Sequence, residues 1–113
     1  MKIISRRIKK STILKKHNSF FKTMIKAVVD VEREVMALDA ELHADLENTL
    51  LCEGSEQEYL WGINLFLDKA RADWIEYTAL INIRPSMDNR SMEVEDPKLR
   101  RKIADIVNRV IID

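Results

Sequence analysis

Residues 54–64 read Gly-Ser-Glu-Gln-Glu-Tyr-Leu-Trp-Gly-Ile-Asn, and residues 80–85 read Leu-Ile-Asn-Ile-Arg-Pro. Alternation at a period of two is typical of a β-strand with one buried face. The first stretch predicts a strand over about residues 58–67, with Trp61 and Ile63 on its buried face. The second belongs to a predicted strand over about residues 74–83, which Pro85 ends because proline has no N–H to donate. The sequence therefore predicts that these two strands are neighbours in one sheet.

Residues 68–73 between these strands have a plausible length for a hairpin connection. If the odd-numbered residues of both strands face the core, a polar set lines the other surface of the sheet. That set comprises Asn64, Glu76, Thr78, Asn82 and Arg84. The same alternation puts Trp61 in the core and Trp74 on the polar face beside Glu76.

The N-terminal half adds three more predicted strands. Residues 2–4 form a short one, the alternation of Ile25, Ala27, Val29 and Val31 indicates a second from Met24, and residues 35–38 form a third that returns antiparallel.

Three helices are also predicted. The first runs from Ser11, a plausible N-cap, to about Phe21, and the second starts near Glu41 and ends before Gly54, which suits a left-handed C-cap. Asp96 and Pro97 start the last helix, whose apolar stripe continues to Ile111.

These elements predict a single α+β domain over residues 1–113. An antiparallel sheet of about four strands, or five if residues 2–4 join it, packs against two or three helices as one pair of layers. A chain of 113 residues buries one core and is too short for two domains. Residues 24–112 form the α+β core. Residues 1–23 form a basic segment, either a short strand plus a helix or partly mobile.

The charges are segregated along the chain although the net charge is zero. Residues 1–29 contain nine Lys or Arg and no acid, residues 30–58 contain ten acids against Arg33 alone, and residues 59–113 balance. The basic residues 1–26 could bind nucleic acid through its phosphates, or could pack beside the acidic segment within the fold.

Two further features concern the compartment. No apolar run approaches the roughly 20 residues that span a bilayer, so no membrane association is expected. The single Cys52 cannot form a disulfide within the chain, which favours a reducing cytoplasm.

An anion-binding group is predicted from Asn82, Arg84, Asn89 and Arg90, because guanidinium forks and amides can bind phosphate or carboxylate in bidentate fashion. The alternative is structural: Arg84 pairs with Glu76 or Glu58, while Asn89 and Arg90 shape the loop. Trp74, on the predicted polar face, is the remaining candidate ligand contact.

His43 is the weak candidate for a catalytic residue, as a general acid or base. Asp45 stands two positions further along the same helix, so the two side chains do not share a face and no metal site is expected. No cofactor is expected either.

Several motifs together resemble a small prokaryotic family catalogued only as a domain of unknown function. The resemblance covers about residues 24–112. It rests on residues 41–45 (Glu-Leu-His-Ala-Asp), 54–55 (Gly-Ser), 60–64 (Leu-Trp-Gly-Ile-Asn), 81–85 (Ile-Asn-Ile-Arg-Pro), 89–91 (Asn-Arg-Ser) and 96–97 (Asp-Pro). It implies a shared fold and cytoplasmic residence, and transfers no activity.

The leading functional hypothesis is a non-enzymatic cytoplasmic binding or interaction module that self-associates or binds a protein partner. Its sheet face and residues 82–90 would contact a small anionic ligand or a partner chain. A small hydrolase or transferase that uses His43 and Arg84 on a phosphate or carboxylate substrate is the first alternative. Nucleic-acid binding through residues 1–26 is the second.

Overall fold

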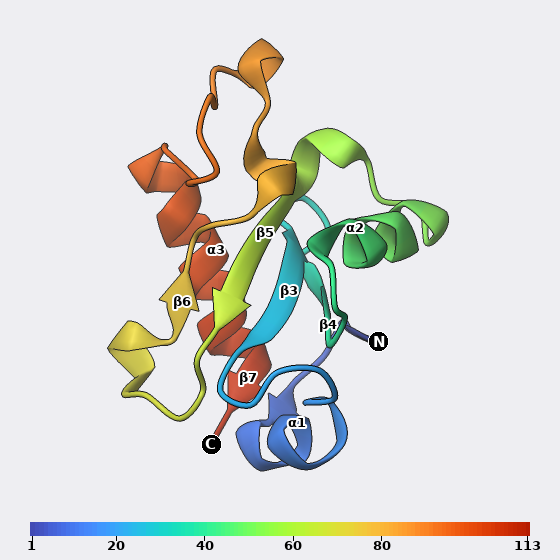
Figure 1. Ribbon diagram of the computed structural model, residues 1–113, viewed down its shortest axis with the longest axis vertical. Coiled ribbons are helices and arrows are strands. Elements are labelled where there is room, and N and C mark those ends of the chain that lie inside the picture. The colour runs from blue at the N-terminus through green and yellow to red at the C-terminus, as the bar shows by residue number, and fades with distance from the viewer.

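The computed structural model describes all residues from 1 to 113 and confirms the α+β class. Five strands form one antiparallel sheet in the order β1-β4-β3-β5-β6, and β2 and β7 form a separate parallel pair (Figure 1). The sheet is slightly larger than the sequence indicated because the N-terminal strand joins its edge. The strands are β1 (Lys2–Ile4), β2 (Ile8–Lys9), β3 (Ile25–Asp30), β4 (Val35–Leu38), β5 (Leu60–Leu65), β6 (Ile75–Glu76) and β7 (Ile111–Ile112). The helices are α1 (Lys10–Lys16), α2 (His43–Cys52) and α3 (Pro97–Val110), with 3₁₀ turns η1 (Gln57–Tyr59), η2 (Arg71–Asp73), η3 (Leu80–Asn82) and η4 (Pro85–Met87).

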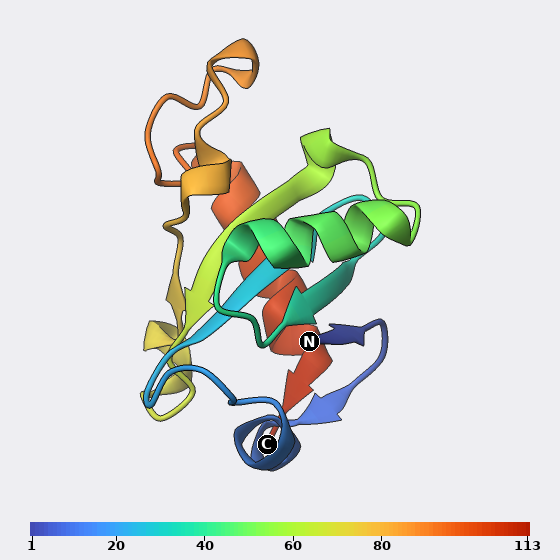
Figure 2. The same cartoon turned by 45° about the vertical axis from the view of Figure 1, so that its right-hand side comes forward.

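Helices cover both faces of the sheet, where the sequence suggested one pair of layers. Figure 2 shows α2 in front of the strands and α3 behind them. The odd-numbered residues of β3 and β5 pack with Ile103 and Val107 of α3 in the main core. The even-numbered Val28 and Leu60 pack with Leu46 and Leu50 of α2 in a smaller second core. Both sheet faces therefore carry apolar residues, which is why each attracts a helix.

The register of the sheet confirms the predicted faces of β3 and β5. Ala27 pairs with Ile63, and Val28 pairs with Gly62. Opposed residues of an antiparallel pair share a face, so Gly62 and Asn64 lie on the α2 side. This side carries the candidate site.

The N-terminal segment is part of the folded domain. β1 confirms the predicted strand and pairs with β4, and β2 pairs with β7 immediately after α3. The first helix is shorter than predicted, because α1 ends at Lys16 rather than near Phe21. Ile111 belongs to β7 rather than to the last helix, because its backbone turns extended after Val110.

The predicted strand over residues 74–83 is wrong for most of its length. Only β6 pairs with β5, and the chain then turns into η3. Asn82 supplies the missing pairing with its side chain: its Oδ1 accepts from the Gly62 N–H at 2.8 Å, and its Nδ2 donates to the Gly62 carbonyl at 2.9 Å. The buried backbone polar groups of Gly62 are thereby satisfied without a strand.

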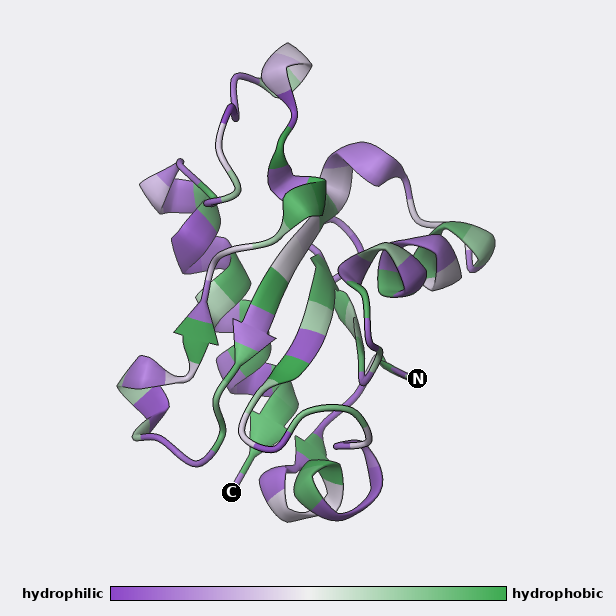
Figure 3. Cartoon of the chain, viewed as in Figure 1, coloured by the Kyte–Doolittle hydropathy of each residue, from purple (hydrophilic) through white to green (hydrophobic).

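The caps and stripes of α2 and α3 follow the sequence closely. Asp96 caps α3 by accepting from the Lys98 N–H at 2.9 Å, and Pro97 follows at the first helical position. Hydrophobic and hydrophilic residues alternate along α3 (Figure 3), consistent with its one buried face. Gly54 adopts φ +100° after α2, as a left-handed C-cap requires. α2 begins at His43, two residues later than predicted, so Leu42 lies outside the helix and is exposed.

Candidate functional site

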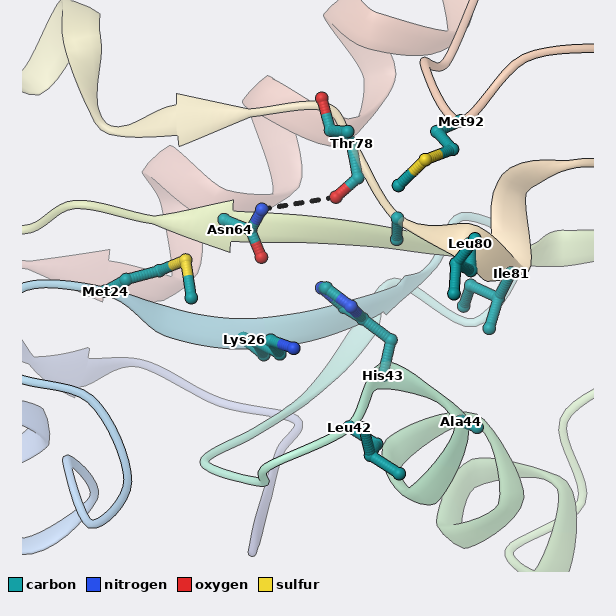
Figure 4. Close-up of a pocket in the computed structure, with 11 residues that line it drawn as sticks. Met24, Lys26, Leu42, His43, Ala44, Asn64, Thr78, Leu80, Ile81 and Met92 are labelled. Atoms are coloured by element: carbon teal, nitrogen blue, oxygen red, sulfur yellow. Dashed lines mark hydrogen bonds between the residues drawn. The ribbon is translucent and has the colours of Figure 1, made fainter.

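A pocket of about 430 Å³ opens between the first turn of α2, strands β3 and β5, and residues 78–81. Most of its lining is apolar, including Met24, Leu42, Leu80 and Met92. Three polar side chains enter it from three different elements: Lys26 from β3, His43 from α2 and Asn64 from β5 (Figure 4). We call this cavity the α2 pocket. A largely apolar cavity with a few converging polar groups is the usual form of a small-ligand site.

Asn64 carries an unused hydrogen-bond acceptor at this pocket. Its Nδ2 donates to Glu76 Oε1 at 2.7 Å and to the Thr78 carbonyl at 3.2 Å. Both partners accept only, so they fix which end of the amide is nitrogen. The other end, Oδ1, is buried and makes no hydrogen bond of normal geometry, although the His43 imidazole lies close enough for Asn64 to raise its pKa. Figure 4 shows this oxygen turned toward the space that His43 and Lys26 enter. A buried acceptor without a donor costs free energy unless something supplies one.

His43 is the first residue of α2, and its imidazole packs against β5. Its Nε2 lies 2.8 Å from the Ile63 carbonyl, so the ring donates there, and Nδ1 is the acceptor in the neutral form. Burial lowers the pKa of His43 below its ordinary value, although the Ile63 contact and Asn64 oppose this shift. The nearby charge of Lys26 lowers the pKa further. His43 is therefore neutral at pH 7.

Gly62 lets the imidazole approach the strand. A Cβ added at Gly62 would lie 3.2 Å from His43 Cδ2 and only 2.5 Å from the Ala79 Cβ. A larger residue would push α2 and residues 79–81 away from β5.

Lys26 is the one charged residue that lines the α2 pocket. Lys26 is half-buried, and its Nζ lies 5.2 Å from the centre of the Phe21 ring. The N-terminus of α2 adds the partial positive charge of the helix dipole. Because His43 is neutral, it contributes hydrogen bonding rather than charge. The pocket thus offers one cationic donor, a helix N-terminus and two acceptors, Asn64 Oδ1 and His43 Nδ1.

The sequence profile of a family described as "Protein of unknown function (DUF5674)" matches residues 2–110. The chain belongs to the DUF5674 family. This confirms the resemblance to a domain of unknown function, and the match extends through the N-terminal segment, where the sequence resemblance began only at about residue 24. No curated protein and no solved structure matches the chain.

Two general findings complete the description of this DUF5674 protein. None of its helices has both the length and the apolar character needed to cross a bilayer. Nowhere do three or more His, Cys, Asp or Glu side chains gather in a way that could hold a metal ion. Asp45 is exposed one position beyond the pocket-lining Ala44 and does not line the pocket with His43.

In this DUF5674 chain the two asparagines of the predicted anion site serve the fold. Asn82 is fully buried and pairs with Gly62, as described above. Asn89 Nδ2 donates to the carbonyls of Asn82, Ser91 and Glu93, and its Oδ1 accepts from the Glu95 N–H at 3.0 Å. The side-chain amide of Asn82 is thus engaged by Gly62 of β5 and by Met92, and that of Asn89 by the loop over residues 82–95. This is the structural alternative that the sequence left open.

Arg84 is also held within the fold. Its side chain is only 10% exposed, and Nη2 donates to the Leu60 carbonyl and to Glu47 Oε2, the latter at 3.3 Å. The ion-pair partner is Glu47 of α2, whereas Glu76 and Glu58 had been considered. The guanidinium lies 4.7 Å from the centre of the Trp61 ring, and burial lowers the pKa of Arg84. Arg84 does not line the α2 pocket, so His43 and Arg84 do not share a cavity.

Arg90 and Trp74 occupy opposite environments. Arg90 is exposed and 3.7 Å from Asp88. Trp74 is 2% exposed, packs in the main core, and donates from Nε1 to the Lys69 carbonyl at 2.9 Å. The prediction that Trp74 lies on the exposed polar face is wrong, because its backbone is helical (φ −64°, ψ −35°) and strand alternation starts only at Ile75. The prediction that Trp61 is a core residue is confirmed.

Sequence reasoning found His43 but not its neighbours in the α2 pocket. Asn64 was correctly placed on the polar face of the sheet, yet nothing in its pattern distinguished it from Asn82. Lys26 belongs to the basic N-terminal segment by its charge and to the polar face of its strand by the alternation from Met24. The register between β3 and β5 makes Lys26 and Asn64 direct neighbours, and only the pairing of the two strands reveals it.

Proposed function

We propose that this protein is a non-enzymatic binding module that takes a small anionic ligand in the α2 pocket. The ligand would have a short apolar body, an acidic group and a hydrogen-bond donor next to that group, as a hydroxy acid or an acylated amino acid has. The observation that carries the proposal is the buried, unpartnered Oδ1 of Asn64 beside Lys26 and His43.

Each part of this ligand complements one chemical property of the pocket. Lys26 and the N-terminus of α2 favour an anion. Asn64 Oδ1 and His43 Nδ1 both accept, so a ligand O–H or N–H satisfies them, whereas a simple carboxylate leaves them unpaired. The side chains of Met24, Leu42 and Met92 favour an apolar body, and flexible methionines adapt to its shape.

Binding is favoured over catalysis because the candidate catalytic groups are engaged within the fold or do not line the pocket. His43 uses Nε2 for its hydrogen bond to the Ile63 carbonyl, and Arg84 forms an ion pair with Glu47. The exposed Cys52 does not line the pocket. No activated nucleophile stands next to His43, as hydrolysis or transfer by covalent catalysis would require.

The test uses three probes of equal chain length with the ¹⁵N-labelled protein. We expect 2-hydroxyhexanoate to shift the amide signals of residues 24–26, 42–44 and 64 in a saturable way. Hexanoate, which lacks the hydroxyl donor, and 1,2-hexanediol, which lacks the charge, should each bind about tenfold more weakly or worse.

Variants locate the site. Lys26→Met removes the charge and keeps the apolar stem, and should weaken 2-hydroxyhexanoate binding about tenfold. Lys22→Met makes the same change at an exposed lysine outside the α2 pocket and should leave binding unchanged. Equal affinity for the three probes, or equal effects of the two variants, would refute the proposal.

The self-association of the protein and its location are further parts of the proposal. Leu80 and Met92 line the pocket and are exposed, as are Ile83 and Met87 in the chain between them, and these apolar side chains make a second copy of the chain the favoured partner. Sedimentation velocity should show a dimer that Leu80→Glu dissociates, and a monomer at every concentration would contradict this. The exposed, unpaired thiol of Cys52 fits the reducing cytoplasm, which cell fractionation tests.

A further inference from the structure

A second hollow, of about 390 Å³, shares no lining residue with the α2 pocket. Four arginines line it: Arg6 and Arg7 from the link between β1 and β2, Arg33 from the turn between β3 and β4, and Arg109 from the end of α3. Ser5, Glu34 and Val110 complete the lining. We call this site the arginine hollow.

The backbone holds these three segments at fixed positions. Ile4 pairs with Met36 and Ile8 pairs with Ile111, so residues 5–7 are anchored at both ends. The turn before β4 is fixed by the fully buried Asp30, whose Oδ1 accepts from the N–H groups of Glu32 and Arg33, both at 2.9 Å. The fold therefore brings the backbones of the four arginines together.

Most of the positive charge in the hollow has no counterpart in the chain. Arg6 and Arg7 form no ion pair, and Arg33 donates from Nη1 to the neutral hydroxyl of Ser55 at 2.8 Å. That hydroxyl in turn donates to Asp30, so the Asp30 carboxylate is linked to the Arg33 guanidinium only through Ser55.

Glu34 is the only acid in the lining, and it is held by two cations. It pairs with Arg109 at 2.6 Å and with Lys102 at 3.3 Å, and both lower the pKa of Glu34. Arg33 donates to Ser55 and also lines a neighbouring hollow with Asp30, Glu32 and Glu56, so its charge is not counted here. Arg6, Arg7 and Arg109 against Glu34 leave an excess of two positive charges in a concave surface. Such a surface focuses potential and attracts anions of high charge density.

We propose that the arginine hollow binds a diphosphate group. Guanidinium forks match phosphate oxygens in bidentate fashion, and the two unpaired forks of Arg6 and Arg7 can each take one phosphate of a diphosphate. No aromatic side chain lines the hollow, so it offers no stacking platform for bases. The phosphates are recognised either in a free diphosphate compound or in a nucleic-acid backbone.

The experiment titrates the ¹⁵N-labelled full chain with pyrophosphate, with ADP and with a twenty-nucleotide oligothymidine. We expect saturable shifts at residues 5–7, 33–34 and 109 with pyrophosphate, weakened by added salt. Replacing Arg6 and Arg7 together by Ala should lower the affinity at least about tenfold. Replacing Lys15 and Lys16 by Ala removes the same charge from exposed positions outside the hollow and should change it little.

Glu34→Gln provides the opposite test, because it frees Arg109 and Lys102 and removes the competing carboxylate. Loss of one repulsive charge at contact distance should raise the affinity for pyrophosphate about fivefold. This gain cannot come from damage to the fold, so it keeps the test decisive even if an arginine variant unfolds.

The ligands separate the two sources of phosphate. Pyrophosphate and ADP binding without the oligonucleotide assigns the hollow to free diphosphate compounds. Tighter binding of the oligonucleotide, lost in the Arg6 and Arg7 variant, assigns it to a nucleic-acid backbone. Absence of saturable binding, equal effects of the two double variants, or no gain with Glu34→Gln would overturn the proposal.

Discussion

Replacing Gly62 by Ala should destabilise the protein through one identified contact. The added methyl group would lie 2.5 Å from the Ala79 Cβ and 3.1 Å from Ile81 Cγ1. Carbon atoms in contact prefer about 3.5–4.0 Å, so the first distance is short by about 1 Å or more. The obstructing atom belongs to a side chain with no rotamer to change, and relief requires the backbone of residues 79–81 to move.

The expected cost follows from these distances. Overpacking of this kind costs about 1–3 kcal/mol, while loss of glycine's freedom in the unfolded chain offsets about 0.4–1 kcal/mol. We therefore expect Gly62→Ala to lower the free energy of unfolding by about 1–2 kcal/mol. Because the shifted backbone carries the pairing of Asn82 with Gly62, the amide signals of residues 79–83 should change as well.

A double-mutant cycle measured by urea denaturation isolates the contact. Ala79→Gly removes the obstructing methyl, so Gly62→Ala should cost less in that background, with a coupling energy of about 1 kcal/mol. Gly54→Ala is the matched control. Gly54 has φ +100° and open space around its missing Cβ, so its cost is backbone strain that Ala79→Gly cannot relieve. This reasoning would be refuted if Gly62→Ala left the free energy of unfolding unchanged. It would also be refuted if the effects of Gly62→Ala and Ala79→Gly on that free energy were simply additive.

Two further predictions concern the polar residues around β5. Asn82→Ala leaves the Gly62 N–H and the carbonyls of Gly62 and Met92 without partners in a buried site. It should lower the free energy of unfolding, measured by urea denaturation, by about 3 kcal/mol or more. A decrease below about 1 kcal/mol would contradict the proposal that Asn82 replaces strand pairing. Burial lowers the pKa of His43, so the unfolded chain takes up its proton near pH 6.5 while the folded chain does so only at lower pH. Stability should therefore fall as pH drops below about 6.5 and level off below the folded pKa. The protein should lose this dependence in His43→Gln, and an unchanged pH profile in that variant would assign the effect elsewhere.

Much of the fold could be predicted because short-range rules govern it. A period of two set the faces of β3 and β5, and the register of Ala27 with Ile63 confirms them. The cap at Asp96 and the left-handed Gly54 depend on residue types with few alternatives. These signals are local, so a single sequence contains them.

The failures have two other causes, the replacement of strand pairing by a side-chain amide and a helical turn at the start of an alternating stretch. Residues 74–83 alternate like a strand, yet the amide of Asn82 takes the place of strand pairing with Gly62. Trp74 alternates with its neighbours in sequence but sits in a helical turn before the strand begins. Periodicity does not report which group completes a hydrogen bond across the sheet.

The candidate site shows why residue type alone misplaces function. Asn64, Asn82 and Asn89 are all buried asparagines, and the sequence favoured the last two for binding. In Asn82 and Asn89 both the oxygen and the nitrogen of the side-chain amide are hydrogen-bonded to the backbone. A ligand could bind them only if those hydrogen bonds broke. In Asn64 the amide nitrogen donates to Glu76, while the amide oxygen is unpaired and lies at a cavity. The hydrogen-bonding capacity left over after folding, rather than the presence of an amide, is what selects Asn64, with Lys26 and His43 beside it, as the place to look for a ligand.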